Sequence, residues 1–248
     1  MINYRTTLPA WHRVARGGWY FIALALLLWD SNLNRFTRPA FLTTRRTFST
    51  SSIAMASRIS ETIRQDHREI ESYYNHIISM PDENDRKKWQ NLFTWELARH
   101  SIGEELVVYP AFEKHLPAGT EIADKDRQEH QKVKEQLKRF QNMKPSDSDF
   151  IPTLQALMAD LLEHIREEET SDLPQLEEAL SEEESQSYST TFGRTKMFVP
   201  SRSHPSAPDK PPFETAVGLL TAPIDRLADL FRKWPHTSGM PNPSPFGV

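Results

Sequence analysis

Four segments of the chain repeat hydrophobic residues every three or four positions, which is the spacing of an α-helix with one buried face. In the last segment the stripe begins as leucine and ends in two polar residues, in the order Leu154, Leu157, Leu161, His164 and Glu168. The other stripes also contain histidine, and they cover residues 59–77 with His67, 93–107 with His100 and Glu104, and 130–140 with His130. The pattern predicts four amphipathic helices that each turn a histidine towards a shared core.

Turn-forming residues mark where these helices end. The first is expected from about residue 60 to 80, before Pro81-Asp82, and the second from about 85 to 109, with a kink or interruption at Pro110. The third begins near Thr120, which is a favourable N-cap, and the fourth has Pro152 in its first turn and ends near residue 170. Short connections between long helices favour an all-α fold, an up-down-up-down four-helix bundle, which we place at residues 58–180.

The C-terminal residues 181–248 are predicted to form a tail with a Pro-rich linker and a short helix. Ser181 and Glu184 have the spacing of a capping box, which would start a short helix after an acidic, solvated extension. Residues 200–212 contain five prolines and read as an extended linker. A last apolar stripe consists of Ile224, Leu227, Phe231 and Trp234. The helix that carries it is expected to be capped by Thr221 and to have Pro223 in its first turn. We expect it to dock on the outside of the bundle; the alternative is a helix on a membrane surface.

The N-terminal residues 1–57 differ in composition from the bundle. Residues 1–48 contain seven arginines and a single acid, as mitochondrial transit peptides do, and Arg46-Thr47-Phe48-Ser49 resembles a cleavage signal. The apolar run 19–29 is too short for a bilayer, which needs about 20 residues. We therefore expect residues 1–57 to be a targeting leader or a disordered N-terminus, and the protein to be mitochondrial. The alternatives are a cytoplasmic protein translated from Met55 and, last, a secreted one.

Charge and cysteine content narrow the chemistry. The net charge of −4 divides into +6 for residues 1–48 and −10 for the remainder, which argues against a nucleic-acid-binding surface. The chain has no cysteine, so disulfides, thiolate metal sites and cysteine nucleophiles are excluded. Histidine and carboxylate remain as the metal ligands that the sequence offers.

The histidines and glutamates on the apolar stripes are costly in a core unless they are paired or bind a metal. A single histidine on an apolar helix face is ordinarily a hydrogen-bonded core residue. A histidine at such a position on all four helices instead indicates one site that the helices share. After the N-terminal segment, four further histidines lie outside the stripes and serve as internal controls, namely His76, His115, His204 and His236. We predict a metal site for two ions, with the ligands His67, His100, Glu104, His130, His164 and Glu168.

The order of the ligands identifies the type of bundle. Ferritin-like di-iron proteins place the carboxylate before the histidine in Glu-x-x-His, whereas this chain has two His-x-x-x-Glu motifs and two single histidines. Together with Asp66 before the first histidine and Glu105, Tyr109 and Pro110 after the first motif, the pattern over about residues 58–170 resembles the hemerythrin-like, HHE cation-binding domain family.

The resemblance implies that the six residues hold two non-haem iron ions joined by an oxo or hydroxo bridge, with zinc or manganese as less favoured metals. Two positions depart from the oxygen-carrying hemerythrins. Lys134 stands where they have a second histidine, and Glu168 and Glu169 stand four and five residues after His164, where they have an aspartate at five. Simple reversible oxygen carriage is therefore not the expected function.

The function predicted from these features is iron binding together with a diatomic ligand such as dioxygen or nitric oxide, in sensing, storage or stress protection. One alternative is an enzyme with the same site, an oxidase, a peroxidase or a nitric-oxide-handling protein. Another is a metal-free helical interaction module. No nucleic-acid partner and no transmembrane span in the mature chain are expected.

Overall fold

The computed structural model describes residues 57–207 and 213–235. Of the leader predicted at 1–57, the structure describes only the last residue. His236 and residues 208–212 of the predicted linker also lie outside the described residues. Within the described ranges the chain is helical and has no strand. None of the helices there is long and apolar enough to cross a bilayer.

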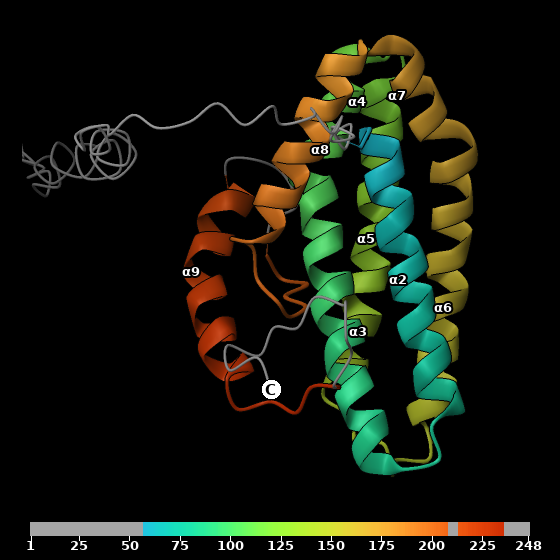
Figure 1. Cartoon of the computed structure of the whole chain (residues 1–248), viewed down its shortest axis with the longest axis vertical. Helices are drawn as coiled ribbons and strands as arrows, with labels where there is room; N and C mark the ends of the chain where they lie inside the picture. The colour runs from blue at the N-terminus through green and yellow to red at the C-terminus, as the bar shows by residue number, and fades with distance from the viewer. Residues whose placement is uncertain (1–56, 208–212, 236–248) are drawn as a thin grey trace, which may run out of the picture. The chain divides into compact units, whose positions relative to one another are not determined.

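Long helices form the bundle: α2 (Ile59–Ser79), α3 (Glu83–Gly103), α5 (Gly119–Gln141) and α6 (Phe150–Glu167). Figure 1 shows them side by side, each joined to the next at one end of the bundle. Their bounds lie close to the predicted ones, but Thr120 does not cap α5, because Ala118 occupies the N-cap position and its methyl side chain accepts no hydrogen bond. Gly119 starts this helix instead, since a Cβ there would lie 1.8 Å from the carbonyl oxygen of Phe112.

The apolar interior is divided along the bundle into two clusters. One cluster, towards the α2–α3 turn, includes Ile70, Leu97, Val133 and Leu161; the other, towards the opposite end, includes Ile63, Val107, Ala123 and Leu173. The histidine of each long helix lies in sequence between a residue of the first cluster and a residue of the second. The predicted site is therefore a polar layer between two apolar cores, which hold the four helices in register above and below it.

Shorter helices extend the bundle. After α3 and α6 the chain continues through two π-helical segments, η1 (Glu104–Val108) and η2 (Glu168–Asp172), into α4 (Tyr109–His115) and α7 (Leu173–Ala179). The predicted capping box is present, and Ser181 starts α8 (Glu182–Lys196). This helix is longer than expected and packs against α2, α3 and η1 (Figure 1).

The tail helix α9 (Phe213–Asp229) docks through a face that the sequence did not predict. Ile224, Leu227 and Phe231 are exposed by 70%, 62% and 84%, so the expected apolar stripe faces outwards except for the buried Trp234. The buried side carries Asp225 and Asp229, which bond to His204 and Ser201 of the preceding segment. Pro223 lies inside the helix rather than in its first turn, which also removes the predicted cap at Thr221.

Candidate metal centre

The predicted ligands come together in the polar layer. His67 lies on α2, His100 on α3, His130 on α5 and His164 on α6, while Glu104 and Glu168 are the first residues of η1 and η2. All six side chains are at most 2% exposed. The packing of the four long helices thus places four imidazoles and two carboxylates in one buried compartment.

Glu104 lies between two pairs of histidines. Its Oε1 is 3.1 Å from Nε2 of His100 and 3.8 Å from Nε2 of His67. Its Oε2 is 3.3 Å from Nε2 of His130, and that nitrogen is 3.1 Å from Nε2 of His164. Each oxygen of Glu104 is therefore directed to a different pair of histidines.

Several inner atoms lack a hydrogen-bond partner although they are buried. They are both carboxylate oxygens of Glu104, both of Glu168 and Nε2 of His67. The nearest contact of Glu168 among the histidines is 3.4 Å, from its Oε2 to Nε2 of His67. Buried polar atoms are rarely left unpaired, and a carboxylate without donors is especially costly. Imidazole nitrogens and carboxylate oxygens aimed at one another in this way fit a divalent or trivalent cation.

The two π-helical segments have a common cause in the sequence. Pro110 follows Glu104 by six residues, and Pro174 follows Glu168 by six. Proline has no amide hydrogen and its ring clashes with the carbonyl one turn earlier, so the α-helical ladder is disturbed before it. The wider turn absorbs the disturbance, and the amides of Tyr109 and Leu173 bond to the carbonyls of the two glutamates. The motif is therefore His-x3-Glu-x5-Pro, and π-helical turns of this kind are frequent at functional sites.

A second layer of carboxylates surrounds the histidines. Each imidazole directs its Nδ1 outwards to a carboxylate oxygen that comes from a neighbouring helix, with the pairs His67–Glu169 at 2.8 Å, His100–Asp66 at 3.3 Å, His130–Glu105 at 3.3 Å and His164–Glu129 at 2.9 Å. Each of these acids is adjacent in sequence to one candidate ligand and pairs with another. The pairs form a closed ring from α2 to α3, α5, α6 and back to α2. A carboxylate at Nδ1 orients the ring and leaves Nε2 free for a metal.

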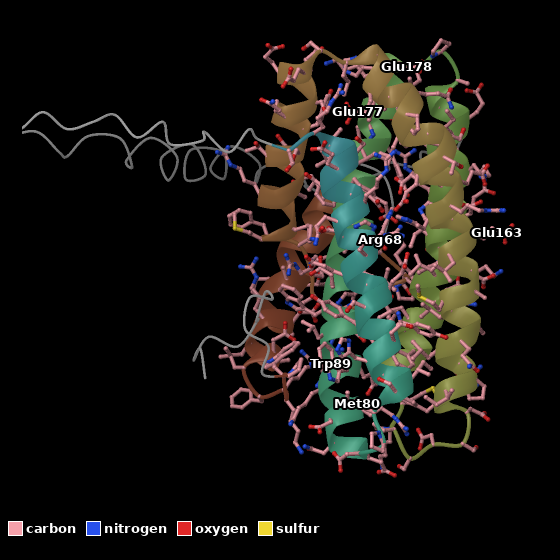
Figure 2. All side chains as sticks on the ribbon, turned by 45° about the vertical axis from the view of Figure 1, so that its right-hand side comes forward. Arg68, Met80, Trp89, Glu163, Glu177 and Glu178 are labelled. Atoms are coloured by element: carbon pink, nitrogen blue, oxygen red, sulfur yellow. The ribbon has the colours of Figure 1, made fainter. Side chains whose placement is uncertain are left out.

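Every carboxylate of this ring also has a basic partner. The pairs are Glu169 with Arg68 at 2.6 Å, Glu105 with Lys134 at 2.8 Å, Glu129 with Lys125 at 3.2 Å, and Asp66 with Lys196. Arg68 lies on the outer face of α2 (Figure 2). With each acid of the ring paired to a base, Glu104 and Glu168 are the two carboxyl groups that face the histidines inside the layer.

Burial and charge set the protonation of the inner groups. Burial lowers the pKa of an imidazole, but the adjacent carboxylates of Glu104 and Asp66 outweigh it and raise the pKa of His100 to about 9. Burial raises the pKa of Glu168 well above its ordinary value, and repulsion by Glu104 adds to the rise. Burial opposes the ionisation of Glu104, yet its histidine neighbours hold its pKa well below the usual range. A cation that binds here must displace protons from His100 and Glu168.

Tyr109 lies beside the candidate ligands. It is fully buried, and its hydroxyl oxygen lies 2.9 Å from Nε2 of His130, the nitrogen that faces the centre. The phenol is therefore within reach of a ligand bound beside His130. The internal controls behave differently within the described residues: His76 stacks on Trp89, His115 contacts Tyr188 and His204 contacts Asp225.

Comparisons with known proteins agree with this arrangement. The profile of the hemerythrin HHE cation binding domain matches residues 58–176. A hemerythrin-like protein of Schizosaccharomyces pombe is 58% identical over 180 residues, which are 72% of this chain and 89% of that protein. A DNA nickase of Nostoc sp. is 26% identical over 149 residues, 58% of this chain but only 40% of the nickase.

Among solved structures, a hemerythrin HHE cation binding domain-containing protein from Mycobacterium kansasii has the same fold. It is 20% identical, with a TM-score of 0.51 over 57% of this chain and 86% of that one. The extent and identity of the Schizosaccharomyces pombe match show the family directly. The chain belongs to the hemerythrin-like proteins, the family of the hemerythrin HHE cation-binding domain.

Proposed function

We propose that this protein binds two non-haem iron ions in its polar layer and that the pair binds a diatomic ligand such as dioxygen or nitric oxide. The observation that carries the proposal is the position of Glu104, a buried carboxylate with no hydrogen-bond donor and with a pair of histidines at each oxygen. His67 and His100 would hold one ion, and His130 and His164 the other. Glu168, with two unpaired oxygens, completes the set.

The donor atoms favour iron. Neutral imidazole together with carboxylate oxygen suits iron, with zinc and manganese as alternatives, and the chain has no thiolate to attract softer metals. When bound, two iron ions supply Lewis acidity and one-electron chemistry. The protein's part is to exclude water from the layer and to fix each imidazole through its Nδ1 partner.

Two features support a small additional ligand. Six protein ligands leave open positions on two ions that prefer about six donors each. Lys134, on the same helix as His130, stands where the oxygen-carrying hemerythrins have a further histidine. Its ammonium pairs with Glu105 instead of facing the centre. The hydroxyl of Tyr109 lies on the His130 side and is able to donate a hydrogen bond to a bound diatomic molecule.

Metal content and the ultraviolet–visible spectrum of the full chain test the proposal. We expect about two irons per chain and visible charge-transfer bands of a ferric pair. The double variant His100→Ala, His164→Ala is expected to lose both, whereas His204→Ala, a histidine outside the layer, retains them. A wild-type protein that folds without metal and melts at the same temperature with and without chelator would favour the interaction module. Catalytic turnover of peroxide or nitric oxide would favour the enzyme.

We also propose that the protein is mitochondrial. The support is the composition of residues 1–48, with seven arginines and one acid. Mass spectrometry of the endogenous N-terminus tests this proposal: a mature chain that begins near Ser49 in purified mitochondria is expected. A cytoplasmic protein that begins at Met55 would contradict it.

A further inference from the structure

The ring of outer carboxylates contains one link that the four-helix bundle does not complete by itself. Arg68, Lys125 and Lys134 come from bundle helices and neutralise three of the acids. The fourth acid, Asp66, receives its positive charge from Lys196, the last residue of α8. That helix lies beyond the residues 58–176 matched by the family profile.

Asp66 connects this lysine to the centre. Its Oδ2 lies 3.3 Å from Nδ1 of His100 and accepts a hydrogen bond from it. The other nitrogen of His100, Nε2, is 3.1 Å from Oε1 of Glu104. The same Oδ2 also accepts a hydrogen bond from Nζ of Lys196. The ammonium is therefore one residue away from a nitrogen that faces the metal layer.

Asp66 lies among other carboxylates, whose repulsion the ammonium of Lys196 offsets. Asp66, Glu69 and Glu96 bring carboxylate oxygens within 4.8 Å of one another, and Asp66 and Glu96 are buried. Buried like charges at this distance repel strongly unless a cation lies among them. Lys196 bonds to both Asp66 and Glu96, so it occupies the place that a free cation would otherwise take. No external ion is needed at this acidic cluster.

Packing fixes Lys196 in this position. Phe192, one turn earlier on α8, lies so close to α3 that a Cβ on Gly103 would be 2.7 Å from its Cε2. The ring of Phe192 also lies edge-on to that of His100, with centroids 6.1 Å apart. Glycine at position 103 thus lets α8 approach the His100 side of the layer, and the approach carries Lys196 to Asp66.

We propose that Lys196 is a positioning residue of the metal centre: it holds Asp66 as the anionic acceptor for His100, so that Nε2 of His100 is presented to one of the two metal ions. The proposal rests on the proposed function, since it requires a metal in the layer. It makes helix α8 part of the centre, and it assigns the effect to the ion on the His67–His100 side. The ion on the His130–His164 side has its own outer partners.

The test is an anaerobic titration of the full chain with Fe²⁺ in competition with a coloured chelator. Lys196→Met is expected to weaken one of the two Fe²⁺ sites by about 10–100-fold, the usual effect of losing an outer partner, and to leave the other site within about twofold. Lys196→Arg, which retains the charge, is expected to restore most of the affinity. The control Lys132→Met removes an exposed lysine that pairs with Asp160 and is expected to change neither site.

A double-mutant cycle with Asp66→Asn separates positioning from folding. The asparagine removes one of the crowded charges, so the variant Asp66→Asn, Lys196→Met is expected to fold even if Lys196→Met does not. If Lys196 acts through Asp66, its removal in the Asp66→Asn background changes neither Fe²⁺ affinity. An additional loss there, or an equal weakening of both sites by Lys196→Met, would overturn the proposal. A wild-type chain that binds no Fe²⁺ would instead refute the proposed function, which is a distinguishable result.

Discussion

Replacement of the shared carboxylate by Glu104→Gln is the perturbation with the largest expected effect. The substitution keeps the shape of the side chain but removes the charge and turns one oxygen into an amide donor. Because each oxygen of Glu104 faces a different histidine pair, we expect both metal ions to be lost together. Loss of a ligand from only one side would remove a single ion.

The expected change in melting temperature follows from the linkage between metal binding and folding. A ligand at about 100 times its dissociation constant stabilises the folded state by about 2.7 kcal/mol, so two ions contribute about 5 kcal/mol. For a protein of about 150–250 residues, each kcal/mol moves the melting temperature by about 2–4 °C. The wild-type protein is therefore expected to melt roughly 10–20 °C lower after chelation, and Glu104→Gln is expected to show almost no chelator-dependent shift.

Thermal unfolding followed by circular dichroism, with and without a strong chelator, measures both quantities on the same sample. Glu163→Gln is the matched control, because Glu163 lies on the outer side of α6, pointing away from the bundle (Figure 2), and is exposed. A chelator-dependent shift in Glu104→Gln of more than half the wild-type value would refute the bridging role. So would the loss of only one of two ions.

Three further predictions concern neighbouring residues. Because the pKa of His100 is raised to about 9, metal affinity should fall about tenfold for each pH unit below 9 from this group alone, and proton release on metal addition in a weakly buffered solution measures it. Tyr109→Phe should weaken nitric oxide binding by about five- to tenfold, the worth of about one hydrogen bond, without loss of iron; unchanged affinity in a nitric oxide titration would contradict this. Gly103→Ala should destabilise the fold by about 1–3 kcal/mol in urea unfolding, because its Cβ meets Phe192; wild-type stability would contradict this packing.

The sequence predicted an all-α fold and a set of side chains on the buried helix faces because both depend on helical periodicity. A stripe with a period of 3.6 residues specifies which face is buried, and His67, His100, His130 and His164 lie on those faces. The positions of Glu104 and Glu168, one turn after a histidine, follow from the same rule. The geometry of the candidate ligands was thus accessible without a structure, although their occupancy by metal stays a prediction.

The outer ring of carboxylates could not be predicted from helical periodicity. Its four acids are adjacent in sequence to candidate ligands, so they lie about 100° around the helix from them and appear as ordinary partly solvated residues. Which histidine each one meets depends on the rotation of neighbouring helices, which a single stripe does not encode. The signal that was available is the acid next to a ligand on every helix, namely Asp66, Glu105, Glu129 and Glu169.

The tail helix was predicted wrongly at its buried face because the sequence rule assumes that apolar residues point inwards. The buried face of α9 carries polar contacts, from Asp225 to His204 and from Asp229 to Ser201. Trp234 is the one residue of the predicted stripe that is buried, and Ser201 and His204 come from a segment without periodicity. The sequence predicted an interruption of the second helix at Pro110, but the matching effect of Pro174 and the π-helical form of both turns emerged only from the structure.

The order of the outer ring has a consequence for the protein before any metal arrives. Each long helix gives an acid to the next helix and receives one from the previous helix, so turning one helix about its own axis breaks two contacts on opposite sides. The rotations of the four long helices about their own axes are therefore coupled. Folding alone fixes the orientation of the four imidazole rings. Because little conformational entropy is left to lose, an incoming ion meets a receptor that is already assembled.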